Sequence, residues 1–324
     1  MNFDIKFWVE VAAFLGGGIS MGFGAIGAAI CEGYTAACAN EAISRNTEIS
    51  GDIFKSMLVG QAIAESASIF ALVISMILLF TKIDGGSIVY VCVPLAAGIT
   101  MGLGAIGSGL GAGFPAGAAC TGIARQPKMS ARLTTNMLIG SAVCQTPSIF
   151  ALVVSLILIY NNFSTYPINP TWAAVLGAGI STGIGTIGPA IGGGLVAKAC
   201  CDGMARNPGE AGQLTNVMLL GQAISQTPSI YTLLVSFILI FKASPATTAI
   251  APAMALLGSG ICMGIGAIGP GAGIGSVGYQ AVKWVARTKE ASGDIKRVML
   301  VGMAVTESTA IYALVISLIL VFVV

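Results

Sequence analysis

The sequence contains no histidine, and charged side chains make up only 9% of its 324 residues. Without histidine, the eight cysteines have no partner for a mixed cysteine and histidine metal site, and they lack metal-ligand spacing. We expect them to be small buried hydrophobic residues. With 56% apolar side chains and a mean hydropathy of +0.91, so few charges exclude a water-soluble domain. The net charge of +2 does not indicate a nucleic acid partner, and we expect none.

The sequence also lacks the patterns on which enzymes and cleaved leader peptides depend. No nucleophile paired with a base is recognisable, and the Gly-x-Gly segments follow no strand and precede no phosphate-loop lysine. Residues 1–10 contain Asp4, Lys6 and Glu10 rather than a basic segment followed by a short apolar core, so we expect no cleaved signal peptide. These absences predict a non-catalytic chain without a cofactor.

Long apolar segments are what the sequence has in abundance. A helix needs about 20 apolar residues to cross a bilayer, and isolated strands would leave backbone groups unpaired in lipid. Eight segments are long enough: 8–43, 53–80, 88–122, 133–160, 171–203, 213–241, 249–286 and 297–324. We predict an all-α membrane protein with eight transmembrane helices, none of them broken.

Basic residues are concentrated in alternate connections between these segments. Twelve of the fifteen Lys and Arg residues lie around 45–55, 125–132, 198–206 and 283–297. Positively charged loops tend to stay on the cytoplasmic side of a membrane. We therefore expect a multi-pass protein of the cell membrane, with the basic turns in the cytoplasm and both termini on the outer side.

The chain consists of four copies of one unit of about 81 residues. In each unit, a glycine-rich segment is followed by a polar turn and then by a segment dense in Leu, Ile, Val and Phe. This order predicts four tandem helical hairpins, with boundaries at 1–81, 82–161, 162–242 and 243–324.

Glycines are aligned along the first helix of every copy. In the first copy they are Gly22, Gly24 and Gly27, and the other copies have glycine at the equivalent positions. Glycine lets neighbouring helices in a membrane approach closely, so each hairpin is predicted to be a wedge that is thin on the glycine side. Four equal wedges favour part of a two-layered closed ring with the glycine helices inside. Close packing within a transporter bundle is the alternative.

One position in the second helix differs between the copies in a way that changes charge. It is occupied by Glu65, Gln145, Gln226 and Glu307, spaced 80, 81 and 81 residues apart. A carboxylate in the middle of a membrane span is costly and is a functional-site hypothesis by default. Glutamine keeps the shape but cannot hold a charge. The first and fourth hairpins therefore carry a predicted site, and the second and third carry none.

Each polar turn has an arginine at the equivalent position, twenty residues before the Glu or Gln: Arg45, Arg125, Arg206 and Arg287. On physical grounds alone, these arginines are either solvated helix caps or contacts for a partner.

The glycine-rich first helix, the turn motif at 124–127 and the mid-membrane carboxylate together resemble the c subunit of F-type ATP synthases, the proteolipid of the rotary ring. The resemblance covers essentially the whole chain, although fused hairpins with missing carboxylates are a feature of V-type rings. It implies a ring of several copies of this chain in membrane lipid, with a stator a-type subunit beside it. It also implies that central-stalk subunits dock at the four arginine turns.

Repeat 4 is similar to sodium-binding c subunits around its glutamate. The resemblance implies that the Val305 carbonyl, Glu307 and the Ser308 hydroxyl bind sodium. Thr309 and Tyr312 match the positions that hold a water molecule and lock the glutamate. A hard cation needs several oxygen ligands, whereas a proton needs one carboxylate. The predicted ion is therefore sodium, and a proton is the alternative.

Repeat 1 retains only part of this pattern. It keeps Ile63, Glu65 and Ser66 but has Ala67 and Phe70 where repeat 4 has threonine and tyrosine, so its site is predicted to be less fully lined. Repeats 2 and 3 have Gln-Thr-Pro at the same place and no acid.

Glu32 is a second unusual acid, in the first helix of repeat 1. Sodium-type c subunits carry a Gln or Glu ligand at this offset, and their sites lie between neighbouring hairpins. Glu32 then meets either Glu307 of an adjacent chain or Gln145 of its own chain. The first pairing is favoured because repeats 4 and 1 complete each other. The alternative is that the Glu32 side chain only reaches water at the membrane interface and binds no ion.

The predicted function is ion translocation by a rotor ring, with fewer ions per ATP than in a full ring and hence a bias toward ATP-driven pumping. A secondary transporter is the alternative from another class, but its repeats are commonly inverted, whereas these are parallel copies. A purely structural membrane oligomer would not explain the Ser and Thr residues around Glu307.

Overall fold

The computed structural model describes residues 4–83, 85–163, 170–245, 247 and 249–323. Within these residues the chain forms helices and turns but no strand. The α-helices are α1 (Ile5–Arg45), α2 (Ser50–Phe80), α3 (Ile88–Arg125), α4 (Ser130–Tyr160), α5 (Thr171–Gly185), α6 (Ile187–Arg206), α7 (Ala211–Ser225), α8 (Thr227–Phe241), α9 (Ile250–Val285) and α10 (Ser292–Phe322).

Eight helical spans in the described part of the chain are long and apolar enough to cross a membrane, which confirms the predicted all-α fold. The fifth span contains α5 and α6, and the sixth contains α7 and α8. The last predicted segment extends to residue 324, which lies outside the described residues.

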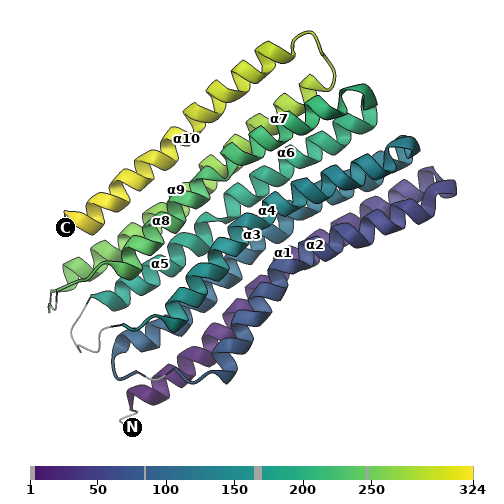
Figure 1. Ribbon diagram of the computed structural model, residues 1–324. Coiled ribbons are helices and arrows are strands. Elements are labelled where there is room, and N and C mark those ends of the chain that lie inside the picture. The colour runs from purple at the N-terminus through teal and green to yellow at the C-terminus, as the bar shows by residue number, and fades with distance from the viewer. Residues whose placement is uncertain (1–3, 84, 164–169, 246, 248, 324) are drawn as a thin grey trace.

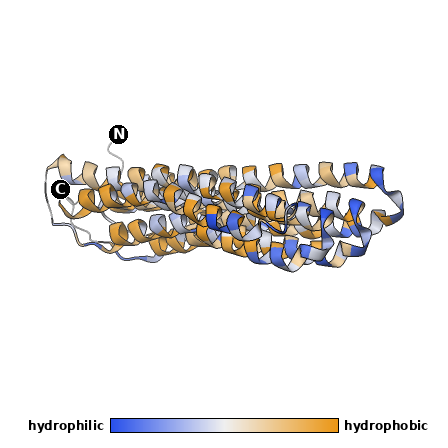
Figure 2. Cartoon of the chain, turned by 90° about the horizontal axis from the view of Figure 1, so that it is seen from above, coloured by the Kyte–Doolittle hydropathy of each residue, from blue (hydrophilic) through white to orange (hydrophobic). Residues whose placement is uncertain are grey.

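Consecutive spans form antiparallel hairpins, and Figure 1 shows the hairpins side by side in chain order from α1 and α2 to α9 and α10. The start of α1 and the end of α10 lie at the same end of the bundle, opposite the turns. Figure 2 shows hydrophilic residues gathered at the turn end, while the remaining length is mainly hydrophobic. This division matches helices that cross an apolar layer and meet water at their turns.

Short 3-10 segments connect the helices of the first three hairpins: Thr47–Ile49, Pro127–Met129 and Pro208–Glu210. Proline begins the second and third of these segments, where its missing N–H group costs nothing. The first helix of each of these hairpins ends with its turn arginine. A cation in the last turn is favourable because of the helix dipole.

Each of the two spans of the third hairpin contains a local irregularity. Thr186 separates α5 from α6, and Gln226 separates α7 from α8. Pro189 and Pro228 follow the two breaks and cannot donate backbone hydrogen bonds to the preceding turn. Both breaks are one residue long with right-handed helical dihedral angles, so each pair of helices still forms one span. Pro147, which is equivalent to Pro228, lies inside the continuous helix α4, so proline permits the break without enforcing it.

The glycine-rich helices pack on one another along most of their length and form one layer, and the bulky helices pack on the outside of this layer. A Cβ atom added at Gly98 would lie 2.2 Å from the carbonyl oxygen of Gly16, and one at Gly188 would lie 2.1 Å from that of Ile268. Such contacts are possible only without a side chain, so glycine here sets how closely the hairpins approach.

Candidate functional site

A polar layer crosses the middle of the bundle between two large apolar clusters. One cluster lies toward the turns and includes Leu133 and Met218. The other lies toward the termini and includes Met101 and Leu239. Between them, small residues and fully or nearly buried polar side chains replace the bulky apolar ones: Ser108, Ser141, Gln145, Ser148, Gln222, Ser225, Gln226 and Ser229. All four copies of the variable Glu or Gln position lie at this level of the second helices.

Gln145 is buried at the junction between repeats 1 and 2. Its Nε2 donates hydrogen bonds to the carbonyl oxygen of Ile63 in repeat 1 (3.1 Å) and to that of Ser108 in its own repeat (3.4 Å). Its Oε1 accepts a hydrogen bond from the Ser148 hydroxyl (3.3 Å). The amide therefore satisfies polar groups on both sides of the junction without a charge.

Gln222 and Gln226 occupy the corresponding layer between repeats 2 and 3. Gln222 Nε2 donates to the carbonyl oxygens of Gly140 in repeat 2 (2.9 Å) and Gly193 in its own repeat (3.1 Å). Gln226 Nε2 donates to the carbonyl oxygen of Pro189 (3.1 Å). The Oε1 atoms of both glutamines are buried and have no hydrogen-bond partner among the described residues.

Glu307 is partly buried and accepts a hydrogen bond from the Tyr231 hydroxyl (2.6 Å). Tyr231 belongs to α8 of repeat 3, so this bond crosses the junction between repeats 3 and 4. The tyrosine that locks Glu307 within the chain is thus Tyr231 and not Tyr312, contrary to the sequence-based assignment. Residues five apart on a helix point about 140° away from each other. Tyr312 is 65% exposed on the open side of repeat 4, the face against which no other repeat of the chain packs.

The other predicted oxygen ligands of repeat 4 bond to their own helix. The Ser308 hydroxyl donates to the Val305 carbonyl (2.7 Å), and the Thr309 hydroxyl donates to the Thr306 carbonyl (3.0 Å). Val305, like Tyr312, is exposed on the open side of the repeat. These groups therefore face away from Glu307 and toward the open side of repeat 4.

Glu65 is exposed on the opposite open side of the chain, in repeat 1. The Ser66 hydroxyl donates to the Ile63 carbonyl (2.6 Å), the same oxygen that accepts the hydrogen bond from Gln145. Ile63 and Ser66 are thus directed toward repeat 2, although the sequence grouped them with Glu65. Glu65 therefore faces the open side of repeat 1, whereas the Ile63 carbonyl faces repeat 2.

Glu32 lies beside the acid of its own hairpin. Gln61 on α2 donates to the backbone carbonyl of Glu32 (3.0 Å), and Glu65 follows Gln61 one turn further along α2. The expected alternative pairing with Gln145 is not formed, because Gln145 faces Ile63 and Ser108. The hairpin itself therefore brings Glu32 and Glu65 to nearly the same level, which neither pairing expected from the sequence included.

Three residues of this layer were missed from the sequence: Gln61, Gln222 and Tyr231. The available signal was the repeat itself, since Tyr231 lies at the same offset from Gln226 as Tyr312 from Glu307. The sequence did not show that this offset points into the next repeat.

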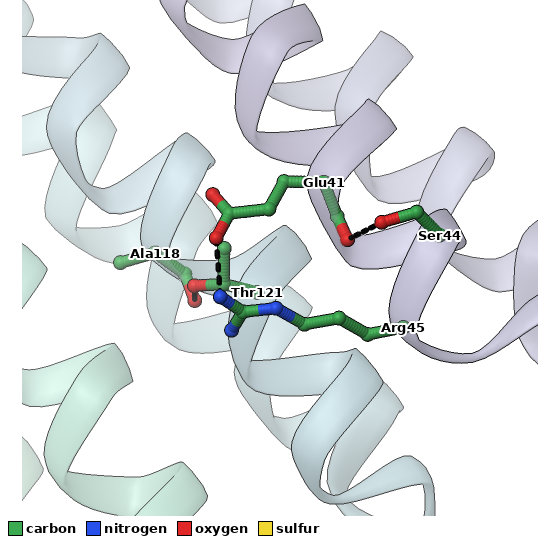
Figure 3. A network of polar contacts seen from close by, with 5 residues as sticks. All are labelled: Glu41, Ser44, Arg45, Ala118 and Thr121. Atoms are coloured by element: carbon green, nitrogen blue, oxygen red, sulfur yellow. Dashed lines mark hydrogen bonds and ion pairs between the residues drawn. The ribbon is translucent and has the colours of Figure 1, made fainter.

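The four turn arginines, Arg45, Arg125, Arg206 and Arg287, are all exposed at the turn end. Figure 3 shows Arg45 paired with Glu41 on α1, while Ser44 donates to the Glu41 carbonyl (2.8 Å). Arg287 lies over the ring of Trp284 at 5.0 Å. Cationic side chains therefore lie on the water-facing surface, where a partner can reach them.

An ion pair joins the turns of repeats 3 and 4. Lys289 Nζ lies 2.5 Å from Glu210 Oε1. This hydrogen bond raises the pKa of Lys289 above its ordinary value. Because Lys289 is highly exposed, the pair is a surface contact of small energetic weight.

All eight cysteines are free, and six of them are buried, in agreement with their prediction as small buried residues. In the part of the chain that the structure describes, no three Cys, Asp or Glu side chains form a metal-binding cluster.

Comparison with known proteins identifies the repeated unit. The family model for the C subunit of ATP synthase matches residues 15–78, 95–158, 176–239 and 257–320, one match in each hairpin. The ATP synthase c subunit of Petrotoga mobilis is 57% identical over 68 residues, which are 21% of this chain and 71% of the relative. The c subunit of Thermotoga maritima is 50% identical over 68 residues, 21% of this chain and 80% of the relative. That of Syntrophobacter fumaroxidans is 42% identical over 90 residues, 28% of this chain and 96% of the relative.

Proposed function

The chain belongs to the ATP synthase C subunit family, and from this membership we propose that it carries sodium ions across the membrane on Glu65 and Glu307 within a rotor ring. The c subunit of ATP synthase is a non-catalytic rotor proteolipid, and such subunits form rings that contact the a subunit and the central stalk. This chain is therefore a multi-pass membrane protein with four c-type hairpins and no enzymatic activity of its own.

The observation that supports the assignment of carriers is the contrast at the mid-membrane position. Only Glu65 and Glu307 can change charge there, while Gln145 and Gln226 are buried amides that donate to backbone carbonyls. Glu307 accepts a hydrogen bond across a repeat junction, which holds the carboxylate in one orientation. A fixed carboxylate with a hydroxyl oxygen beside it suits a hard cation such as sodium.

The proposed cycle depends on neutralising this carboxylate. An ion enters through a half-channel in the a subunit and binds the glutamate, whose charge it cancels. The hairpin can then face lipid, because an uncompensated charge in the bilayer is costly. The ring turns, and the ion leaves on the other side. Hairpins with Gln145 or Gln226 pass the lipid at all times but transport nothing.

A ring with fewer carriers moves fewer ions per turn. Each charge that crosses the membrane supplies only ~2.3 kcal/mol per 100 mV, so a lower ion-to-ATP ratio weakens synthesis. The arrangement favours ATP-driven pumping against a steep gradient.

The remaining parts of the proposal concern assembly. The chain is divided into hairpins at 1–81, 82–161, 162–242 and 243–324, the arginine turns contact the central stalk in the cytoplasm, and both termini lie outside. Closure of the ring needs several copies, and roughly three chains with about twelve hairpins is the expected number. Mass spectrometry of the intact ring measures this number directly.

Carbodiimide labelling of the purified ring tests the choice of ion. Dicyclohexylcarbodiimide modifies a protonated carboxyl group, and a bound sodium ion shields it. At mildly acidic pH, labelling of Glu65 and Glu307 should slow as sodium rises through the millimolar range, and potassium serves as the control without effect. Labelling that accelerates at lower pH but ignores sodium would identify a proton rotor instead.

A further inference from the structure

The four polar turns differ in charge, although the hairpins lie side by side and all turn at the same end (Figure 1). The equivalent residues are 41–55, 121–135, 202–216 and 283–297. The first turn has two cations and three acids, and the third has one cation and two acids, so each has a formal charge of −1. The second turn has three cations and no acid, and the fourth has five cations and two acids, so each has a formal charge of +3. A partner that approaches the turns therefore meets alternating charge rather than four copies of one contact.

The arginines of the two acidic turns have a carboxylate close by in the same repeat. Arg45 in the first turn pairs with Glu41, as Figure 3 shows. Arg206 in the third turn lines a small pocket together with Asp202. Both arginines therefore have a counter-charge within the chain and attract an external acid only weakly.

The turn of repeat 2 is different. Its three cations are exposed: Arg125, Lys128 and Arg132. None of the three forms an ion pair with a residue that the structure describes. The fourth turn has the same net charge but mixes its cations with two acids, and its Lys289 is already paired with Glu210 of the third turn. Arg125, Lys128 and Arg132 are called the basic patch below.

Local helix energetics do not account for the basic patch. Arg132 lies in the first turn of α4, where repeats 1 and 4 have Asp52 and Asp294 in the first turns of α2 and α10. The helix dipole favours an acid at this end of a helix and disfavours a cation. Lys128 likewise replaces a glutamate that repeats 1 and 4 share. Two positions have thus changed from acidic to basic, one of them against the preference of its own helix.

Membrane orientation does not account for the basic patch either. Lysine and arginine keep a loop in the cytoplasm, whereas acidic residues have little influence on orientation. The other three turns satisfy this bias while they retain two or three acids each. The complete absence of acids from the turn of repeat 2 therefore needs a further reason, and an acidic group outside the chain supplies one.

We propose that the basic patch of repeat 2 is the anchoring point of a soluble protein partner with an acidic docking surface, and that this contact occurs once in each chain. The basic patch lies at the hydrophilic end of the bundle, beyond its mainly hydrophobic length (Figure 2), where such a partner can reach it. Like charges that face each other across an interface are unfavourable, so an acidic surface prefers this turn to the turns on either side. The four hairpins then contribute unequally to docking, and the chain fixes the register of its partner.

This inference rests on the proposed function in taking the turns as the surface that meets the central stalk. What it adds is the charge of the docking surface and the repeat that receives it. An exchange of charges between the first two turns tests both.

The double variant Lys128→Glu, Arg132→Asp gives the second turn the residue types of the first turn at these positions. Each replacement changes the charge by two units, so the turn changes from +3 to −1. The matched variant Glu48→Lys, Asp52→Arg makes the opposite exchange in the first turn. The complete rotary complex is purified in mild detergent, and native mass spectrometry measures how much of the soluble part stays attached as salt rises. We expect the first variant to bind the soluble part roughly tenfold more weakly at low salt, and the second variant to bind it no less tightly than the unchanged chain.

Circular dichroism of both variants checks that the helices are intact. Equal retention of the soluble part in the two variants would overturn the proposal. So would a loss that is as large at high salt as at low salt, because salt screens exposed charges. If the unchanged chain retains no soluble subunit even at low salt, the proposed function itself fails, and this inference fails with it.

Reconstitution into lipid nanodiscs separates a protein partner from lipid head groups. The basic patch would bind lipid, contrary to the proposal, if the first variant kept its soluble subunits and lost only a preference for anionic over neutral nanodiscs. A loss of the soluble subunits to the same extent in both kinds of nanodisc would support the protein partner.

Discussion

The two middle repeats and the two outer repeats differ in the residue at the variable mid-membrane position and in how that residue is paired. In repeats 2 and 3 the variable position is a buried glutamine whose Nε2 donates to backbone carbonyl oxygens. In repeats 1 and 4 it is a glutamate: Glu65 is exposed, and Glu307 is partly buried under the hydroxyl of Tyr231. The same backbone thus supports both a neutral, closed junction and a chargeable one.

The contacts of the Gln145 amide explain why this junction is stable without a charge. Gln145 Nε2 lies between the carbonyl oxygens of Ile63 and Ser108, where a cation would otherwise find two oxygen ligands. The amide supplies the positive end of a dipole at that point, so the junction needs no ion. The amide of Gln145 is therefore paired with oxygen atoms without an ion.

Removing a carboxylate should have the largest effect on this comparison. Glu307→Gln makes repeat 4 resemble a middle repeat, and we expect loss of ion-coupled ATPase activity because an amide cannot exchange charge. The control is Gln145→Ala, which should only weaken activity through poorer packing. Equal losses in the two variants, measured in reconstituted vesicles, would refute the assignment of carriers.

The reverse substitution should convert a closed junction into an ion-dependent one. Gln145→Glu places a carboxylate opposite the carbonyls of Ile63 and Ser108, which costs about 1–3 kcal/mol for unsatisfied buried groups. Binding of a cation between these oxygens would offset the cost, since a ligand of the folded state stabilises it. We expect the thermal stability of this variant to rise with sodium but not with potassium. A stability independent of sodium would show that the junction cannot hold the ion.

A smaller effect is expected one turn away from the variable position. Gln222 is fully buried and donates to two carbonyl oxygens, whereas the equivalent Gln61 is partly buried and donates to one. Gln222→Met should lower stability by about 1 kcal/mol, and Gln61→Met by less. Melting of the detergent-solubilised protein provides the measurement, and a larger loss for Gln61→Met would show that the edge repeat is the more constrained one.

The smallest effect is expected at the turn surface. Lys289 has a raised pKa because of its hydrogen bond to Glu210. A raised pKa in the folded state means that the contribution is present at neutral pH and is lost as pH rises through that pKa, above 10.5. Lys289→Ala should leave the melting temperature at pH 7 nearly unchanged, because the lysine is exposed. A marked loss of stability at pH 7 would show that the pair contributes to the junction of repeats 3 and 4.

Much of the fold follows from local properties of the chain. Apolar segments longer than a bilayer must be helical, and the fourfold repeat with its glycine pattern predicted hairpins that pack through their first helices. The eight predicted spans are confirmed, and local irregularities at Thr186 and Gln226, before Pro189 and Pro228, distinguish repeat 3. The equivalent proline of repeat 2 lies in an unbroken helix, so the surroundings decide between the two outcomes.

For the site, the sequence by itself determined which positions can be charged, because Glu65 and Glu307 differ from Gln145 and Gln226 in chemistry alone. It could not determine which groups meet. Tyr231 reaches Glu307 and Ile63 reaches Gln145 only because adjacent hairpins pack with the second helix of one repeat against the Glu or Gln of the next. The geometry of the junction is a property of two packed hairpins, and four similar repeat sequences do not reveal in which direction each hairpin faces.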